Sequence, residues 1–132
     1  MWEFKNPSYG DQIRVNRGLY SHHGIYASDN EVYHFAAVEG SETNPENAKV
    51  ICTSLDKFLK GGNVEVIVYS DEELLKKKTP DEIIDYAKSH LGEGGYDLIS
   101  NNCEHFSNRC AFGTSNSDQV DNIMSFVKRL FG

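Results

Sequence analysis

Residues 20–38 read "YSHHGIYASDNEVYHFAAV", and this stretch decides the fold. Two runs rich in aromatic and β-branched residues flank a polar segment, 28–31. Within that segment Asp29 and Asn30 tolerate the left-handed conformations that a tight turn requires. The pattern predicts a β-hairpin that carries three of the five histidines of the chain.

The hairpin histidines divide between two faces of the predicted sheet. Alternation along the first strand places His22 and His23 on opposite faces. A two-residue turn at 29–30 predicts that His34 lies opposite Ile25, on the His23 face. A register slip of one residue would move His34 to the His22 face. Periodicity therefore leaves the choice between His22 and His23 open, with a slight preference for His23.

Further strand patterns lie on both sides of the hairpin. Residues 6–18, "NPSYGDQIRVNRG", contain a turn followed by apolar residues that alternate with polar ones, which predicts a strand. Residues 50–59, "VICTSLDKFL", predict a strand that leads into a short helix, with Thr53 or Ser54 as its cap. Residues 64–70, "VEVIVYS", are the strongest strand pattern in the chain.

The clearest helix signal begins at Thr79. Thr79 and Glu82 have the spacing of a capping box, and Pro80 takes the first helical position, where its missing N–H costs nothing. Apolar residues then recur at helical spacing, and Gly92 ends the predicted helix.

Two more helices are predicted toward the C-terminus. One covers residues 103–111, with Ser100, Asn101 or Asn102 as its cap. The other begins at Ser117 and carries one apolar stripe, for which we expect packing against the core. Because strands come first and helices last, the sequence predicts an α+β fold, in which an antiparallel sheet is packed by C-terminal helices.

Length and composition limit the classes of function. A chain of 132 residues is the length of one domain, which we expect to span residues 1–132. The net charge of −7 argues against nucleic acid as a partner, because phosphate binding needs a cationic surface. The chain shows neither a signal peptide nor an apolar run that spans a bilayer, and its three cysteines are an odd number. We therefore expect a cytoplasmic protein with reduced thiols.

Cys103 stands out among the three cysteines by its position. It falls in the first turn of a predicted helix, where free N–H groups and the helix dipole favour negative charge. Such an environment lowers the pKa of a thiol, and the thiolate is the nucleophilic form. The same N–H groups can donate to the oxyanion that develops on an acyl carbonyl. The position therefore suits a nucleophile, which would also need a histidine nearby as its base.

Two other interpretations of Cys103 compete with catalysis. Free cysteine is among the most buried residue types, so a packed thiol is the simpler interpretation for Cys103 alone, and we expect it for Cys52 and Cys110. Zinc binding with His105 is disfavoured, because the usual Cys-x₂₋₄-Cys or His-x₃₋₅-His spacing is absent. We therefore expect no metal and no cofactor.

An ordered set of motifs resembles a known family. The motifs are Gly10-Asp11, "HHGIY" at 22–26, "VYHF" at 32–35, "NCEHF" at 102–106 and "SDQV" at 117–120. In this order they resemble the LRAT-like family, named for lecithin:retinol acyltransferase, and in particular its H-rev107-type phospholipase/acyltransferases. The resemblance covers residues 7–120, which is nearly the whole chain.

The resemblance implies roles for named residues. It implies that Cys103 is the nucleophile, that His22 rather than His23 is the base, and that His34 orients or polarises His22. Apart from the resemblance, Tyr26 is a candidate to line the substrate cleft or to hydrogen-bond there, although packing is the more common role of a tyrosine on a hairpin. The implied fold is a circular permutation of the NlpC/P60 papain-like core.

The resemblance also implies a chemistry. We expect an acyltransferase or phospholipase that acts on acyl esters of (phospho)lipids through a cysteine thioester, with possible peripheral membrane contact. Residues 39–63 have no counterpart of the retinol-specific insertion, which disfavours a retinoid substrate. An NlpC/P60-like cysteine amidase or peptidase is the alternative enzyme, and a catalytically silent H-box/NC interaction protein is the alternative outside catalysis. The sequence does not indicate the oligomeric state.

Overall fold

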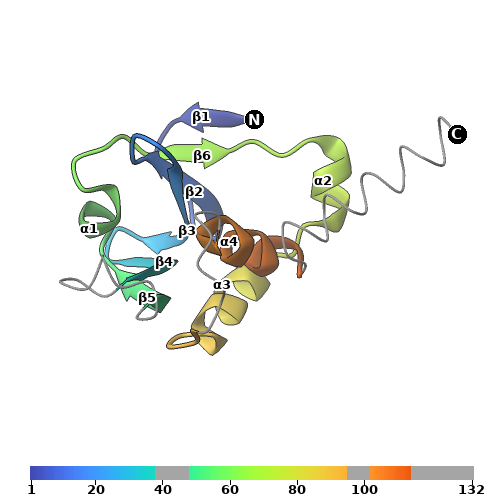
Figure 1. The fold of residues 1–132 in the computed structure, drawn as a ribbon. Coiled ribbons are helices and arrows are strands. Elements are labelled where there is room, and N and C mark those ends of the chain that lie inside the picture. The colour runs from blue at the N-terminus through green and yellow to red at the C-terminus, as the bar shows by residue number, and fades with distance from the viewer. Residues whose placement is uncertain (38–47, 95–101, 114–132) are drawn as a thin grey trace, which may run out of the picture.

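The computed structural model describes residues 1–37, 48–94 and 102–113. Within these ranges the chain is an α+β structure with an antiparallel sheet and helices packed on it, as predicted (Figure 1). The strands are β1 (Trp2–Phe4), β2 (Asp11–Asn16), β3 (Ser21–Ser28), β4 (Glu31–Ala37), β5 (Ala48–Thr53) and β6 (Glu65–Ile67). The helices are α1 (Leu55–Leu59), α2 (Asp71–Lys76), α3 (Pro80–Ser89) and α4 (Asn102–Phe112).

The six strands form one sheet in the order β1-β6-β2-β3-β4-β5, and every pair of neighbours is antiparallel. From β2 to β5 the strands follow their order in the sequence. β6 returns to the opposite side and inserts between β1 and β2, where Val66 pairs with Ile13. The predicted hairpin, β3 and β4, therefore lies inside the sheet, next to β2 on one side and β5 on the other.

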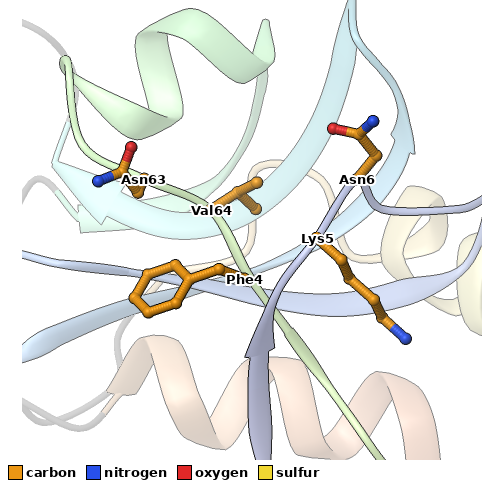
Figure 2. A pocket seen from close by; sticks show the side chains of 5 residues that line it. All are labelled: Phe4, Lys5, Asn6, Asn63 and Val64. Carbon is orange, nitrogen blue, oxygen red and sulfur yellow. The ribbon is translucent and has the colours of Figure 1, made fainter.

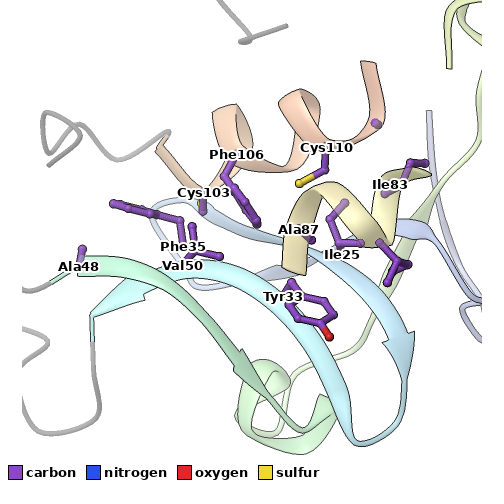
Figure 3. Close-up of a cluster of buried hydrophobic side chains, with 12 residues drawn as sticks. Ile25, Tyr33, Phe35, Ala48, Val50, Ile83, Ala87, Cys103, Phe106 and Cys110 are labelled. Carbon is purple, nitrogen blue, oxygen red and sulfur yellow. The ribbon is translucent and has the colours of Figure 1, made fainter. Parts of the chain in front are cut away.

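Apolar side chains cover both faces of the sheet. On one face, α3 and α4 pack against β3, β4 and β5, and together these elements bury a large cluster (Figure 3). Phe106 and Cys110 of α4 belong to this cluster and are 3% and 0% exposed, which confirms the burial predicted for Cys110. On the other face, Phe58 of α1 is fully buried in a smaller cluster with Ile13, Val15, Val32 and Val66.

Helix caps explain where the helices begin. The Thr79 hydroxyl accepts a hydrogen bond from the backbone N–H of Glu82 at 3.2 Å, and the Glu82 carboxylate accepts one from the Thr79 N–H at 3.1 Å. This is the predicted capping box of α3. Ser54, one of the two predicted candidates, caps α1 by accepting from the N–H of Lys57. The hydroxyl of Thr53 is thereby left for another partner.

The register of the β3–β4 hairpin differs from the prediction. Ser28 pairs with Glu31, so the two-residue turn is confirmed. The register then shifts by one residue between Tyr26 and Ser28, which leaves Ala27 as the extra residue of a β-bulge. Beyond the bulge Ile25 pairs with Tyr33, so the predicted pairing of Ile25 with His34 is wrong. The bulge moves His34 to the face of the sheet that carries His22.

Other departures concern individual elements. β6 is shorter than the predicted strand over 64–70, and α2 was not predicted. Cys52 is exposed rather than buried, on β5, which is an edge strand. Asn102 is the first residue of α4 rather than its cap. The other cap candidates, Ser100 and Asn101, and the helix predicted from Ser117 lie outside the described residues.

Candidate active site

A pair of histidines meets on the face of the sheet that α1 covers. The Nε2 atom of His22, on β3, lies 2.8 Å from the Nδ1 atom of His34, on β4. The rings meet edge to face, with their centroids 5.0 Å apart. Both side chains are buried, and both rings contact Phe58 of α1 at centroid distances of 5.0 and 5.1 Å.

A glycine makes room for Phe58 between the strands. A Cβ atom at Gly24 would lie 2.7 Å from the Phe58 ring and 3.2 Å from the carbonyl oxygen of Tyr33. Because real Cβ atoms do not approach other atoms so closely, the Phe58 ring rests on the bare backbone of β3. The glycine of the "HHGIY" motif therefore allows Phe58 to pack against both imidazoles.

A chain of hydrogen bonds fixes the tautomers of this pair. The Thr53 hydroxyl donates to the carbonyl oxygen of Ser54 at 3.1 Å, so its oxygen is an acceptor toward the Nε2 atom of His34 at 2.9 Å. His34 therefore carries its proton on Nε2 and accepts at Nδ1. That acceptor requires a proton on Nε2 of His22, which leaves the Nδ1 atom of His22 unprotonated.

Burial keeps both imidazoles neutral. Loss of solvent, followed by the charge effects of His34 and Arg17, lowers the pKa of His22 to about 2. Loss of solvent, followed by the charges of Arg17 and Lys60, lowers the pKa of His34 to about 4. Both groups are uncharged near neutral pH, so the Nδ1 atom of His22 keeps its lone pair, and the lowered pKa makes His22 a weak base.

Cys103 lies in the first turn of α4 and is 6% exposed. Its sulfur lies 3.8 Å from the carbonyl oxygen of Ser21, to which the thiol donates. Burial raises the pKa of the Cys103 thiol, and hydrogen bonds from the backbone N–H groups of His23 and Glu104 oppose that rise. The raised pKa favours a neutral thiol, although a helix start was expected to favour the thiolate.

The thiol contacts the backbone on both sides of His22. The Ser21 carbonyl belongs to the peptide that precedes His22, and the N–H of His23 belongs to the peptide that follows it. Of the two ring nitrogens of a histidine, Nδ1 is nearer to its own backbone. Within the described part of the chain, no hydrogen bond joins the Cys103 sulfur to the Nδ1 atom of His22. The structure thus places the Cys103 thiol against the backbone of β3 at His22, whereas the His22 ring lies on the opposite face of the sheet, the one that α1 covers.

His23 points to the opposite face and does not contact His34. Its ring meets the edge of Trp2 at 5.4 Å, and its Nε2 atom lies 3.7 Å from a carboxylate oxygen of Glu104. Burial, together with the charge of Arg14, lowers the pKa of His23 to about 4. The slight preference of the periodicity argument for His23 as the partner of His34 is therefore wrong.

Tyr26 lies on the same face as His22, beside the Phe58 cluster. Its hydroxyl donates to a carboxylate oxygen of Asp29 in the turn at 2.7 Å. This hydrogen bond, with a smaller effect of burial, raises the pKa of Tyr26 to about 12. The Asp29 contact directs the Tyr26 hydroxyl toward the turn, and its role in binding substrate stays a prediction.

Two residues of the site were not found from the sequence. Thr53 was considered only as a helix cap, and Phe58 only as part of a short helix. No local pattern marks either role, because both depend on which elements β5 and α1 meet in the folded chain. The sequence left Thr53 and Ser54 as alternative caps, and the use of Ser54 in the structure leaves the Thr53 hydroxyl for His34.

Neither a metal-binding cluster nor a membrane-spanning helix is present among the described residues. No group of three or more His, Cys, Asp or Glu side chains within 1–37, 48–94 and 102–113 is arranged to hold a metal ion. Among the described helices, none has the length and apolarity needed to cross a membrane.

Comparison with known proteins identifies the family. The sequence model of the lecithin retinol acyltransferase family matches residues 5–116. Lecithin retinol acyltransferase of Rattus norvegicus is 31% identical over 151 residues, which cover 98% of this chain and 64% of the rat protein. Phospholipase A and acyltransferase 2 of Homo sapiens is 32% identical, with 92% of this chain and 80% of the human protein covered. Phospholipase A and acyltransferase 1 of Homo sapiens is 31% identical, with 93% and 78% covered. The chain therefore belongs to the lecithin retinol acyltransferase family.

Proposed function

We propose that the chain is an acyltransferase or phospholipase that acts on acyl esters of phospholipids through a cysteine thioester. The names of its relatives support the class of reaction, since they include phospholipase A and acyltransferase 1 and 2. The observation that carries the proposal is the hydrogen-bond chain from the Ser54 carbonyl to His22. It leaves the Nδ1 atom of His22 unprotonated, and the Cys103 thiol contacts the backbone on both sides of His22.

In this proposal Cys103 is the nucleophile, His22 is the general base and His34 is a positioning residue. The Nδ1 atom of His22 takes the thiol proton while the sulfur attacks the ester carbonyl. Backbone N–H groups at the start of α4 stabilise the negative charge on the carbonyl oxygen. The bond from the acyl carbon to the alcohol oxygen then breaks, and the alcohol leaves with the proton from His22.

The second half of the reaction repeats these steps with another acceptor. Water, an alcohol or an amine attacks the thioester, and His22 takes a proton from this attacking molecule. The sulfur then receives that proton and leaves as a thiol. Water gives hydrolysis, and the other acceptors give acyl transfer. The neutral resting states of His22 and Cys103 mean that the proton moves during the attack, rather than before substrate binds.

The first test is incubation with a diacyl phospholipid, followed by measurement of the intact mass of the protein. We expect one acyl adduct on the unmodified chain and none on Cys103→Ala. Cys52→Ser is the matched control, because Cys52 is the exposed thiol and its loss should leave the adduct in place. An adduct that persists in Cys103→Ala would exclude Cys103 as the nucleophile.

The same assay separates the two adjacent histidines. His22→Ala should slow adduct formation strongly, and His23→Ala should retain it, because only His22 contacts His34. The opposite result would assign the base to His23. A permuted papain-like core, a single domain over 1–132 and a cytoplasmic location remain predictions from the sequence.

A further inference from the structure

Exposed apolar side chains gather at the end of the sheet where β3 begins. Leu19 and Tyr20, in the connection between β2 and β3, are 103% and 48% exposed, and Phe4 at the end of β1 is 72% exposed. Glu65 pairs with Phe4 on one side and with Arg14 on the other, so β1 and β2 run toward the same end. Leu19 is two residues from Ser21, whose carbonyl contacts the Cys103 thiol.

The connection that carries Leu19 is a well-fixed turn. The N–H of Gly18 donates to the side chain of Asn16 at 2.6 Å, and the N–H of Arg17 donates to the carbonyl of Tyr20 at 2.8 Å. The Arg17 guanidinium donates to the carbonyl of Phe58 at 2.6 Å, which ties the turn to α1. These hydrogen bonds fix the turn with the Leu19 side chain exposed to solvent. Exposure of this apolar surface to water is energetically unfavourable.

A shallow hollow continues this surface toward β1. It has a volume of about 410 Å³ and is open to solvent (Figure 2). Its lining side chains are Phe4, Lys5, Asn6, Asn63 and Val64. The surface therefore combines an apolar tip, an exposed aromatic ring and an open hollow at one end of the molecule.

Cationic groups border the same end, although the whole chain carries a net charge of −7. Arg17 and Lys60 lie close enough to the histidine pair for their charges to act on both His22 and His34. On the exposed side of α1, Asp56 and Lys57 offset one another, which leaves Lys60 as the net charge there.

We propose that this end of the chain docks on a phospholipid bilayer, with Leu19 inserted at the interface and Lys60 facing anionic headgroups. The proposal rests on the proposed function, because it identifies the form in which that site receives its substrate. The acyl esters of a phospholipid lie at the boundary between headgroups and acyl chains, and Cys103 is nearly inaccessible from water. A tip seated at that boundary brings the ester to the thiol without moving the lipid fully into water.

The test is cosedimentation with phosphatidylcholine vesicles and with vesicles of phosphatidylcholine and phosphatidylserine. The full chain carrying Cys103→Ala is used throughout, so that binding is read without turnover. Leu19→Ser should weaken binding to both kinds of vesicle about tenfold, because a buried leucine is worth well over 1.4 kcal/mol. Leu75→Ser is the matched control, since Leu75 is 88% exposed on α2, at the other side of the molecule (Figure 1).

The charge contribution is tested with Lys60→Asn, which suits the left-handed backbone of that residue. It should weaken binding about fivefold to vesicles with phosphatidylserine and leave phosphatidylcholine binding unchanged. Lys76→Gln, on α2, is the control and should change neither. Added salt should weaken only the phosphatidylserine component.

Three results would overturn the docking surface. The first is that the Cys103→Ala chain does not bind vesicles, and the second is that Leu19→Ser binds them equally well. The third is that Leu19→Ser changes the oligomeric state without changing vesicle binding. The last would assign Leu19 to an interface between copies of the chain. Vesicle binding that survives while the acyl adduct fails to form would instead exclude the proposed function and keep the surface.

Discussion

At the scale of single residues, the tautomer of His22 depends on a hydroxyl that touches neither the thiol nor the base. Thr53 can orient His34 only because its own proton is committed to the Ser54 carbonyl. If that hydroxyl donated to His34 instead, each ring would carry its proton on the other nitrogen. His34 would then be protonated on Nδ1, and so would His22. The basicity of His22 is thus set at the end of β5.

Thr53 provides a direct test of this role. Thr53→Val removes the acceptor for the Nε2–H of His34, so we expect kcat to fall about fivefold with little change in KM, since one buried hydrogen bond is worth about 1 kcal/mol. Thr53→Ser keeps the hydroxyl and should restore kcat. ¹⁵N spectra of the histidine rings should show the His22 tautomer change in Thr53→Val alone. Equal kcat in Thr53→Val and the parent would leave Thr53 with a packing role only.

Sequence patterns located the candidate residues better than they located their contacts. Alternation correctly placed His22 and His23 on opposite faces, and the turn at Asp29 and Asn30 was correct. The bulge at Ala27 could not be predicted, because alanine and the following serine fit either face. The resemblance of the "HHGIY" motif, and not periodicity, indicated His22.

At the scale of elements, α2 and α3 begin with the same capping box but contribute differently to the fold. α3 buries Ile83, Ile84 and Ala87 against the sheet, whereas α2 buries no residue. The box of α3 was predicted. The equivalent box of Ser70 and Glu73 was overlooked because Ser70 ends the apolar run of the predicted strand over 64–70. Because Ser70 fits both the end of a strand and the cap of a helix, the sequence alone does not show where the strand ends.

This pair of helices predicts two different effects of the same substitution. Thr79→Ala should lower the free energy of unfolding by about 1 kcal/mol, because the packed helix α3 unfolds together with the core. Ser70→Ala should change the global value much less, since α2 can fray without exposing buried residues. Urea denaturation of both variants measures the difference. Equal losses would mean that α2 unfolds cooperatively with the sheet.

At the scale of the whole molecule, three uncharged histidines are buried on the two faces of one sheet. The pKa values of His22, His23 and His34 are lowered to about 2, 4 and 4, mainly by burial. In the unfolded chain the same groups have a pKa of about 6.5. Below that value the unfolded chain binds more protons than the folded one, so acid favours unfolding.

The stability of the chain should therefore fall on the acid side of neutrality. The contribution of these histidines is fully present above about pH 6.5 and is lost as the pH falls, toward pH 4 for His23 and His34 and toward pH 2 for His22, at up to about 1.4 kcal/mol per pH unit for each group. Urea denaturation at a series of pH values measures the slope. His23→Phe removes one titrating group and should reduce that slope by about a third. A free energy of unfolding that stays constant between pH 7 and pH 5 would contradict the assignment.

The bulge at Ala27 has a consequence for protein engineering. Two successive histidines on β3 mean that a deletion of one residue near the turn would exchange which of them faces His34. A histidine pair grafted onto another hairpin must therefore bring the extra residue with it, because the "HHGIY" and "VYHF" letters alone would assemble the wrong partners. The spacing between the two motifs, counted to a single residue, is as much a part of the pair as the imidazoles.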